Sequence, residues 1–189
     1  MLYVRNKRCS AEKLKKEFPG CVIIDVTSKA EDEWIKLSPF YPHGGIPVPF
    51  SDGVTSMSVE GVWQGLKVFE GEDIDYSSFR NSTMKGLKRT VRTKGKCLGH
   101  RKGTLGGELL GYIDARREIY VPAYFWMLEN KCADLVRKLR IISKSKDVVL
   151  LDYDTNADIA DASKPLSHAS LILRYISETS DPTPVAGKG

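Results

Sequence analysis

Hydrophobic and polar positions along the chain follow two patterns, which predict short buried strands and amphipathic helices. Continuous apolar runs indicate strands, and apolar residues at helical spacing indicate helices. The predicted strands are 2–5, 22–26 and 148–152. The predicted helices are 10–18, 58–69, 117–143 and 164–178. Ser10 is the expected N-cap of the first helix, and Pro122 interrupts or begins the third.

Two further segments break these patterns. Residues 30–50 hold four prolines and the pair Gly44-Gly45, which exclude regular structure, while the apolar pieces between them predict a packed loop. Residues 179–189 are rich in Ser, Pro, Gly and Thr, and we expect a disordered tail there. The whole pattern predicts one mainly helical α+β domain over 1–178 with a few short strands, too irregular for a doubly wound sheet.

Composition narrows the class of protein. A chain of 189 residues with 41% hydrophobic residues suits one domain with a sizeable core. Nowhere do about 18 apolar residues occur together, so no membrane span is expected. The four cysteines are dispersed and there are only three histidines, so we expect no structural zinc, no other cofactor and reduced thiols in a cytoplasm.

The placement of charge is more informative than the net charge of +5. No Asp or Glu occurs in 76–107, a window that is rich in Lys and Arg. Such a block is either a solvated loop or a surface that faces phosphates, and the sequence leaves both interpretations open. In the second case, nucleic acid would bind through the basic segment 80–102.

The stretch 58–69 carries the most suggestive polar residues. Glu60, Gln64 and Lys67 are spaced i, i+4, i+7, which places them within roughly 60° of one another on a helix. This face is either solvated, with a weak salt bridge, or the wall of a site. Trp63 and the preceding loop SPFYPHGG favour a pocket for a flat or ribosyl ligand. Gly61 and Gly65 would allow another backbone to come close.

Known catalytic motifs are otherwise missing from the chain. GxGxxG, GxxxxGK[ST] and GxSxG do not occur. Asp152, Ser167 and His168 include two sequence neighbours, which cannot easily form a catalytic triad on a helix. His168 is therefore interpreted as a capping or packing residue.

Two short blocks resemble the signature of the NADAR superfamily, also called YbiA-like. LSPFYP (37–42) is similar to that family's LSNFYP, and SVEGVWQGLKVF (58–69) is similar to its helix Ser/Thr-x-Glu-His-x-aromatic-Gln-x-x-Lys. The matching helix residues are Ser58, Glu60, Trp63, Gln64 and Lys67. The order of later segments also agrees, so the resemblance covers roughly residues 34–178 and implies a NADAR-like fold.

The chain departs from that pattern at three places. Gly61 stands where the family has His, and Pro39 stands where it has Asn. The Asp/Trp/Gly motif between the last strand and the last helix is replaced by NADIADASKPLSHAS. The resemblance therefore implies a divergent branch, of the kind found in phages, whose substrate differs from that of other members.

The resemblance implies cleavage of an N-glycosidic bond in an ADP-ribosyl or other ribosyl-phosphate adduct. A carboxylate is suited to the positive charge that develops on the ribose, so Glu60 is the candidate acid–base group. Lys67 would form a Schiff base if burial lowers its pKa. The candidate substrate-binding residues are Tyr41, His43, Trp63, Gln64, Arg101, Lys102, Asp152 and Asn156. Asp154, at the end of the same strand, would help to complete the pocket.

Two rival hypotheses remain beside this one. The first keeps the pocket but loses catalysis, so that the protein sequesters a nucleotide or binds nucleic acid. The second is an interaction protein without a pocket, which predicts a buried Trp63 and a polar helix face open to water.

Overall fold

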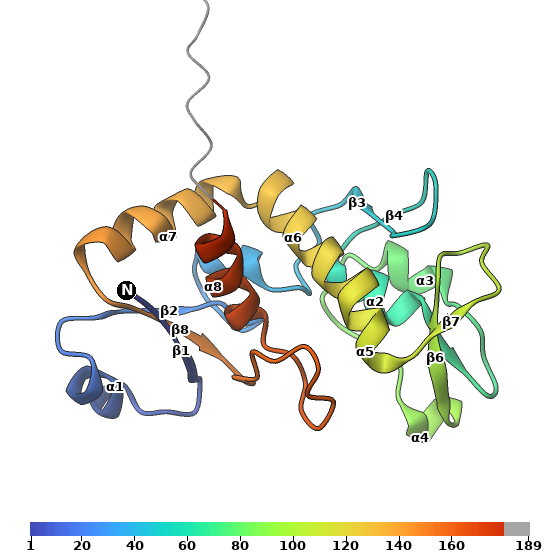
Figure 1. Ribbon diagram of the computed structural model, residues 1–189, viewed down its shortest axis with the longest axis horizontal. Coiled ribbons are helices and arrows are strands. Elements are labelled where there is room, and N and C mark those ends of the chain that lie inside the picture. The colour runs from blue at the N-terminus through green and yellow to red at the C-terminus, as the bar shows by residue number, and fades with distance from the viewer. Residues whose placement is uncertain (180–189) are drawn as a thin grey trace, which may run out of the picture.

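A three-stranded parallel sheet forms one end of the protein in the computed structural model, which describes residues 1–179 (Figure 1). Its strands are β1 (Leu2–Asn6), β2 (Val22–Asp25) and β8 (Val148–Asp152), in the order β1-β8-β2. The apolar run of β8 takes the central place, because both of its faces are covered. Val149 packs on Leu14 of helix α1 (Ala11–Glu17) and on its C-cap residue Phe18, so that α1 covers one face.

Helices cover the opposite face of this sheet. They are α7 (Ala133–Ser145) and α8 (His168–Glu178), which share the main core with Val148 and Leu150. Alternate residues of β8 therefore enter different clusters, as the pleat of a strand requires. Ser10 caps α1 as predicted, since its side chain accepts a hydrogen bond from the Lys13 N–H.

The other end of the molecule is built from short elements around a second, antiparallel sheet. That sheet has the order β5-β6-β7, with strands Lys67–Phe69, Cys97–Arg101 and Leu109–Leu110. Strands β3 (Ile46–Pro47) and β4 (Thr55–Ser56) form a separate hairpin. The short helices are η1 (Glu33–Leu37), α2 (Val59–Gly65), α3 (Tyr76–Arg80), α4 (Val91–Lys94) and α5 (Tyr112–Ala115).

A central helical segment joins the two ends. It runs from the π-helical turn η2 (Arg116–Tyr120) into α6 (Val121–Asn130), which contacts α2, α7 and α8. Figure 1 shows α6 crossing the middle of the molecule. Tyr124, Met127 and Leu128 of α6 are fully buried, and one continuous core includes residues from both ends. The prediction of an α+β domain is confirmed.

The predicted helix over 58–69 is wrong in its second half. Helix α2 ends at Gly65, and Lys67 is the first residue of strand β5. Lys67 pairs with His100 of β6, and the Arg101 N–H donates to the Leu66 carbonyl. The apolar residues keep helical spacing as far as Phe69, but these long-range hydrogen bonds outweigh that local preference and end the helix earlier.

Two other predicted helix boundaries shift for local reasons. Pro122 lies in the first turn of α6, directly after the π-helical turn η2, and the helical segment is interrupted only at 131–132. Helix α8 begins at His168, because Ser167 caps it. Most of the predicted tail, 180–189, lies outside the described residues.

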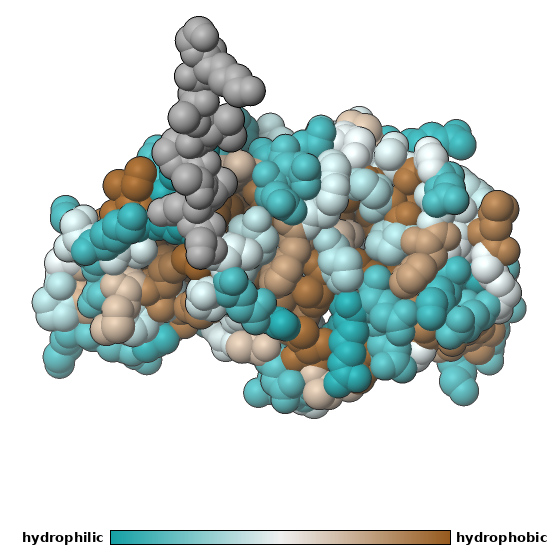
Figure 2. Space-filling view, turned by 45° about the horizontal axis from the view of Figure 1, so that its top comes forward, coloured by the Kyte–Doolittle hydropathy of each residue, from teal (hydrophilic) through white to brown (hydrophobic). Residues whose placement is uncertain are grey.

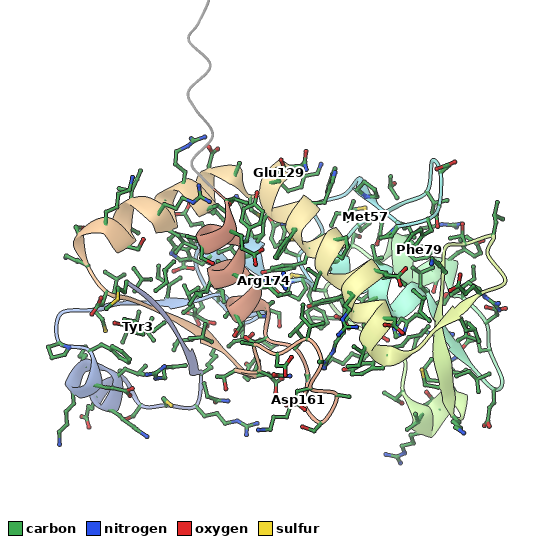
Figure 3. All side chains as sticks on the ribbon, viewed as in Figure 1. Tyr3, Met57, Phe79, Glu129, Asp161 and Arg174 are labelled. Carbon is green, nitrogen blue, oxygen red and sulfur yellow. The ribbon has the colours of Figure 1, made fainter. Side chains whose placement is uncertain are left out.

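The glycines of α2 allow the close approach that their spacing predicts. A Cβ on Gly61 would lie 2.7 Å from the Ser78 carbonyl oxygen, and one on Gly65 would lie 2.2 Å from the Phe79 ring. Figure 3 shows Phe79 of α3 beside α2. The two helices therefore touch through bare backbone on the side of α2 that faces α3.

Replacing Gly65 by Ala is expected to destabilise the protein by about 1–3 kcal/mol, because the new methyl group overlaps a buried ring. Urea denaturation measures this change. Gly107→Ala is the matched control, since nothing lies within 4 Å of its added methyl group. Equal stability of the two variants would contradict the packing argument.

The surface and the thiols complete the description. Hydrophilic side chains predominate on the face drawn in Figure 2, with apolar side chains in groups between them. Each helix within residues 1–179 is too short or too polar to cross a bilayer. Cys9, Cys21, Cys97 and Cys132 are all free.

Candidate functional site

A cavity of about 350 Å³ lies where the parallel sheet meets α2 and the basic segment. The carboxyl ends of β2 and β8 bound one side, which is the edge where α/β sheets commonly bind ligands. The lining residues are Thr27, Ser28, Ser38, Pro39, Phe40, Glu60, Trp63, Gln64, Lys67, Lys88, Arg89, Thr90, Tyr112, Arg116, Tyr120, Asp152, Tyr153, Asp154, Pro165, Leu166 and His168.

Glu60 is held by the first turn of α2. Ser58 caps this helix by accepting a hydrogen bond from the Gly61 N–H at 2.9 Å, and the Glu60 N–H donates to the Pro39 carbonyl at 2.8 Å. The Glu60 side chain is 7% exposed. Burial raises the pKa of its carboxyl group, although a hydrogen bond from Gln64 and the nearby Lys67 oppose this.

Lys67 enters the same cavity from the first position of β5. Its Nζ lies 5.9 Å from the centre of the Trp63 ring. Burial lowers the pKa of this amine, and the charge of Glu60 partly offsets the effect. The cavity thus brings an acid with a raised pKa and an amine with a lowered pKa together, a pairing typical of acid–base and nucleophilic sites.

Aromatic rings form one wall of the cavity. Trp63 makes edge contacts with Tyr112 and Tyr120, at centroid distances of 5.9 and 5.4 Å. The ring of His100 lies against Trp63 at 3.8 Å. Burial lowers the pKa of His100 to about 3, so this imidazole is neutral at physiological pH. The rings of this wall are therefore uncharged, and their faces suit a flat ligand.

The basic segment contributes one buried and one exposed cation to the lining. The Arg89 guanidinium donates to the carbonyl oxygens of Gln64, Lys67 and Asp73 at 2.7–2.9 Å and fastens the segment to α2 and β5. Lys88 is exposed, and its Nζ lies 5.9 Å from the Phe40 ring centre. The block therefore contains a structural arginine as well as side chains that can meet a ligand.

A buried ion pair borders the cavity at the start of α8. His168 Nδ1 lies 3.0 Å from Asp152 Oδ2, and His168 Nε2 lies 2.8 Å from the Val26 carbonyl oxygen. Both ring nitrogens face acceptors, so both carry protons and the imidazole is cationic. Burial alone would lower the pKa of His168, but the Asp152 carboxylate raises it; the pKa of Asp152 is lowered in turn.

Ser167 and His168 both contact the same carboxylate, and this geometry is not a catalytic triad. Ser167 Oγ donates to Asp152 Oδ2 at 2.8 Å, so Asp152 lies between the serine and the histidine. A triad needs the histidine in that central place. The packing interpretation of His168 agrees with this arrangement.

Arg116 fixes the loop that closes the cavity between β8 and α8. This side chain is 1% exposed and donates to the carbonyl oxygens of Ile159, Asp161 and Lys164. Figure 3 shows Asp161 on that loop below α8. Asn156 donates to two of the same carbonyls, at Asp161 and Lys164. Its amide therefore shapes the loop instead of pointing to the cavity.

Part of the predicted site lies in the cavity. Both candidate catalytic residues line it, together with four of the predicted or suggested binding residues: Trp63, Gln64, Asp152 and Asp154. The predicted residues that do not line it are Tyr41, His43, Arg101, Lys102 and Asn156. The interpretation of a solvated polar helix face is wrong, because Glu60 and Gln64 are buried.

Like Asn156, the other predicted site residues that do not line the cavity contact residues elsewhere. His43 contacts the Lys36 carbonyl and the Tyr41 ring. Arg101 pairs with Asp73 at 2.6 Å, and Lys102 pairs with Glu118 at 3.1 Å. The acid-free window had suggested unpaired cations, but acidic residues from outside that window neutralise these two.

Several lining residues were missed by sequence reasoning. Tyr112 and Arg116 precede the predicted helix 117–143, and Tyr120 lies in it, where the apolar pattern indicates only a helix. Thr27 and Ser28 come shortly after β2, beyond Val26. The position of these two after a buried parallel strand was the available signal, because ligand sites gather at such ends.

The fold and cavity define a class: a single α+β domain with a buried acid–amine site at the edge of a small parallel sheet. The chain belongs to a family of unknown function, DUF6939, whose model matches residues 6–172. This match includes the whole cavity lining and every strand except most of β1. A search of curated proteins found no match.

Proposed function

We propose that the protein is a divergent NADAR-like N-glycosidase that cleaves a ribosyl N-glycosidic bond in an ADP-ribosyl or ribosyl-phosphate adduct. The observation that carries the proposal is the convergence of Glu60, Lys67 and Trp63 on one cavity with the end of β8. A carboxyl group and an amine beside an aromatic wall supply the groups that this chemistry needs. The resemblance of 37–42 and 58–69 to the NADAR signature supports the same reaction class.

The proposed reaction consists of displacement of the base, opening of the sugar ring and hydrolysis of an imine. Lys67 Nζ attacks C1′ while the C1′–N bond breaks, and the leaving base takes a proton from Glu60. The C1′–O4′ bond then opens as a proton passes from the Lys67 nitrogen to O4′, which leaves a protonated imine on Lys67. Water, deprotonated by Glu60, adds to C1′ of this imine. Transfer of the new hydroxyl proton to Nζ breaks the C1′–Nζ bond and releases neutral Lys67 and the sugar as the free aldehyde, which closes to the ring form.

Trapping of the imine tests the proposal. The protein is incubated with ADP-ribosyl and ribosyl-phosphate adducts of nucleobases in the presence of sodium borohydride, and peptides are analysed by mass spectrometry. We expect a reduced sugar adduct on residue 67, and loss of that adduct in Lys67→Met. Lys88→Met, which removes an equal charge from another lining residue, should still be modified at Lys67. Base release with no adduct would exclude the imine and leave water as the nucleophile.

A second candidate function is sequestration of a nucleotide-like ligand without turnover. The packing at Gly61 favours it, because a Cβ there would lie 2.5 Å from Ser56 Oγ. The histidine that the NADAR pattern has at this position therefore does not fit. Calorimetry with ADP-ribose and oligonucleotides, combined with product analysis, separates the two functions. Tight binding without product formation supports sequestration.

The basic segment supports an anionic ligand in both cases. Within residues 1–179, Arg80, Lys85, Lys88, Arg92 and Lys96 have no acidic partner. Lys88 and Thr90 line the cavity, so the segment leads from the surface to the site. We propose that these cations contact phosphates of the ligand or of a nucleic-acid strand in the cytoplasm, which is that of the host cell if the protein is viral.

A further inference from the structure

Gln64 is the residue whose contacts indicate a role other than the one its sequence position suggests. Its side chain is 4% exposed and lies between Glu60 and the basic segment. Gln64 Oε1 accepts the Arg89 N–H at 3.1 Å, and Gln64 Nε2 donates to Glu60 Oε1 at 2.7 Å. A backbone N–H can only donate, so the Arg89 contact fixes which end of the amide faces Glu60.

We infer that Gln64 is a positioning residue that holds the Glu60 carboxyl group and sets its protonation equilibrium, with the Arg89 backbone as its anchor. The inference deepens the proposed function and rests on it for its catalytic meaning. The predicted role of Gln64 as a substrate-binding residue changes accordingly. The amide oxygen is already used, and only the second Nε2–H is left to meet a ligand acceptor.

Arg89 is a suitable anchor because its position is determined by several contacts. Its guanidinium binds the Gln64, Lys67 and Asp73 carbonyls and lies 3.2 Å from a Glu72 carboxylate oxygen. It also lies 5.0 Å from the Phe69 ring centre. The Arg89 side chain therefore binds the backbone of both Gln64 and Lys67. It links the position of Gln64, which contacts Glu60, to the position of Lys67.

The hydrogen bond from Gln64 acts on Glu60 in a definite direction. An N–H donor stabilises a carboxylate more than a carboxylic acid, so it favours the ionised form against the effect of burial. Without this donor, burial would act on Glu60 with less opposition, and the group would remain protonated to higher pH. The hydrogen bond from Gln64 thus opposes the rise in the Glu60 pKa that burial causes.

Direct titration of Glu60 in the ligand-free protein tests this inference. Carbon-13 labelled glutamate and NMR report the Glu60 pKa in the wild type and in Gln64→Met, which keeps the volume and removes the donor. We expect an upward shift of about one pKa unit, the size expected for a lost hydrogen bond to a charged group. Thr90→Val changes another lining residue that does not contact Glu60, and it should leave this pKa in place.

A second variant keeps the test decisive if Gln64→Met does not fold. Gln64→Glu retains an acceptor for the Arg89 N–H and brings a second carboxyl group to Glu60, which should raise the upper apparent pKa of the pair. An unchanged Glu60 titration in a folded variant would overturn the positioning role.

Activity gives an independent readout on any substrate that the wild type cleaves. A positioning role predicts that the limb of the kcat profile set by ionisation of Glu60, the alkaline limb for the general acid of the first step, moves to higher pH in Gln64→Met while KM changes little. A direct ribose contact predicts the reverse, a raised KM with an unmoved profile, and would contradict the inference. Since the titration needs no substrate, failure of the proposed function would leave that result intact.

Discussion

Glu60→Gln is expected to lower turnover of the N-glycosidic substrate by about 10²–10⁴-fold, the usual contribution of a positioned acid–base group. The substitution preserves size and leaves Gln64 Nε2 an acceptor at the position of Glu60 Oε1. It removes the ability to transfer a proton and the negative charge of the ionised group. Base release, measured by chromatography at saturating substrate, checks the loss, and substrate affinity should change little because the cavity keeps its shape.

The stability of this variant separates a catalytic role from a structural one. The folded-state pKa of Glu60 is raised, so the wild type is destabilised by ionising this group as pH rises above its unfolded value of about 4.3. Glu60→Gln lacks that ionisation and should be at least as stable as the wild type at pH 7. Loss of activity together with loss of stability would indicate that Glu60 serves the fold.

The sequence predicts the parts of the fold that depend on local chemistry. Strand β8, the cap at Ser10 and the close packing of Gly61 and Gly65 follow from apolar runs, a capping side chain and missing Cβ atoms. The end of α2 could not be predicted in this way. Lys67 leaves the helix because it pairs with His100, a partner 33 positions further along the chain.

The site shows the same division between local and long-range information. Glu60 and Gln64 lie one helical turn apart, and spacing alone placed them together. Lys67 reaches the cavity although its predicted helix position is wrong, because the strand turns its side chain to the same side. Arg89, in contrast, looks like one more surface cation in the sequence, and only its burial identifies it as an anchor.

His168→Ala is expected to lower the free energy of unfolding by about 3–5 kcal/mol near neutral pH, which would be the largest stability change predicted for this protein. The substitution leaves the Asp152 carboxylate buried with its main counter-charge removed, at the junction of β8 and α8. The Ser167 hydroxyl and the Ala169 N–H still donate to Asp152 but carry no net charge. Urea denaturation at pH 7 gives the free energy.

The pH dependence distinguishes this ion pair from simple loss of packing. The folded-state pKa of His168 is raised, so its stabilisation is complete below the unfolded value of about 6.5 and is lost as pH rises through the folded value. The folded-state pKa of Asp152 is lowered, so its share is present above about 3.9 and is lost as pH falls through its own folded value. Wild-type stability should therefore decline on both sides of this range, whereas His168→Ala should lack the alkaline decline.

His43→Ala is the matched control, because burial lowers the pKa of His43 and its removal leaves the alkaline decline intact. An alkaline decline that persists unchanged in His168→Ala would mean that another group titrates there and that the ion pair does not stabilise the junction.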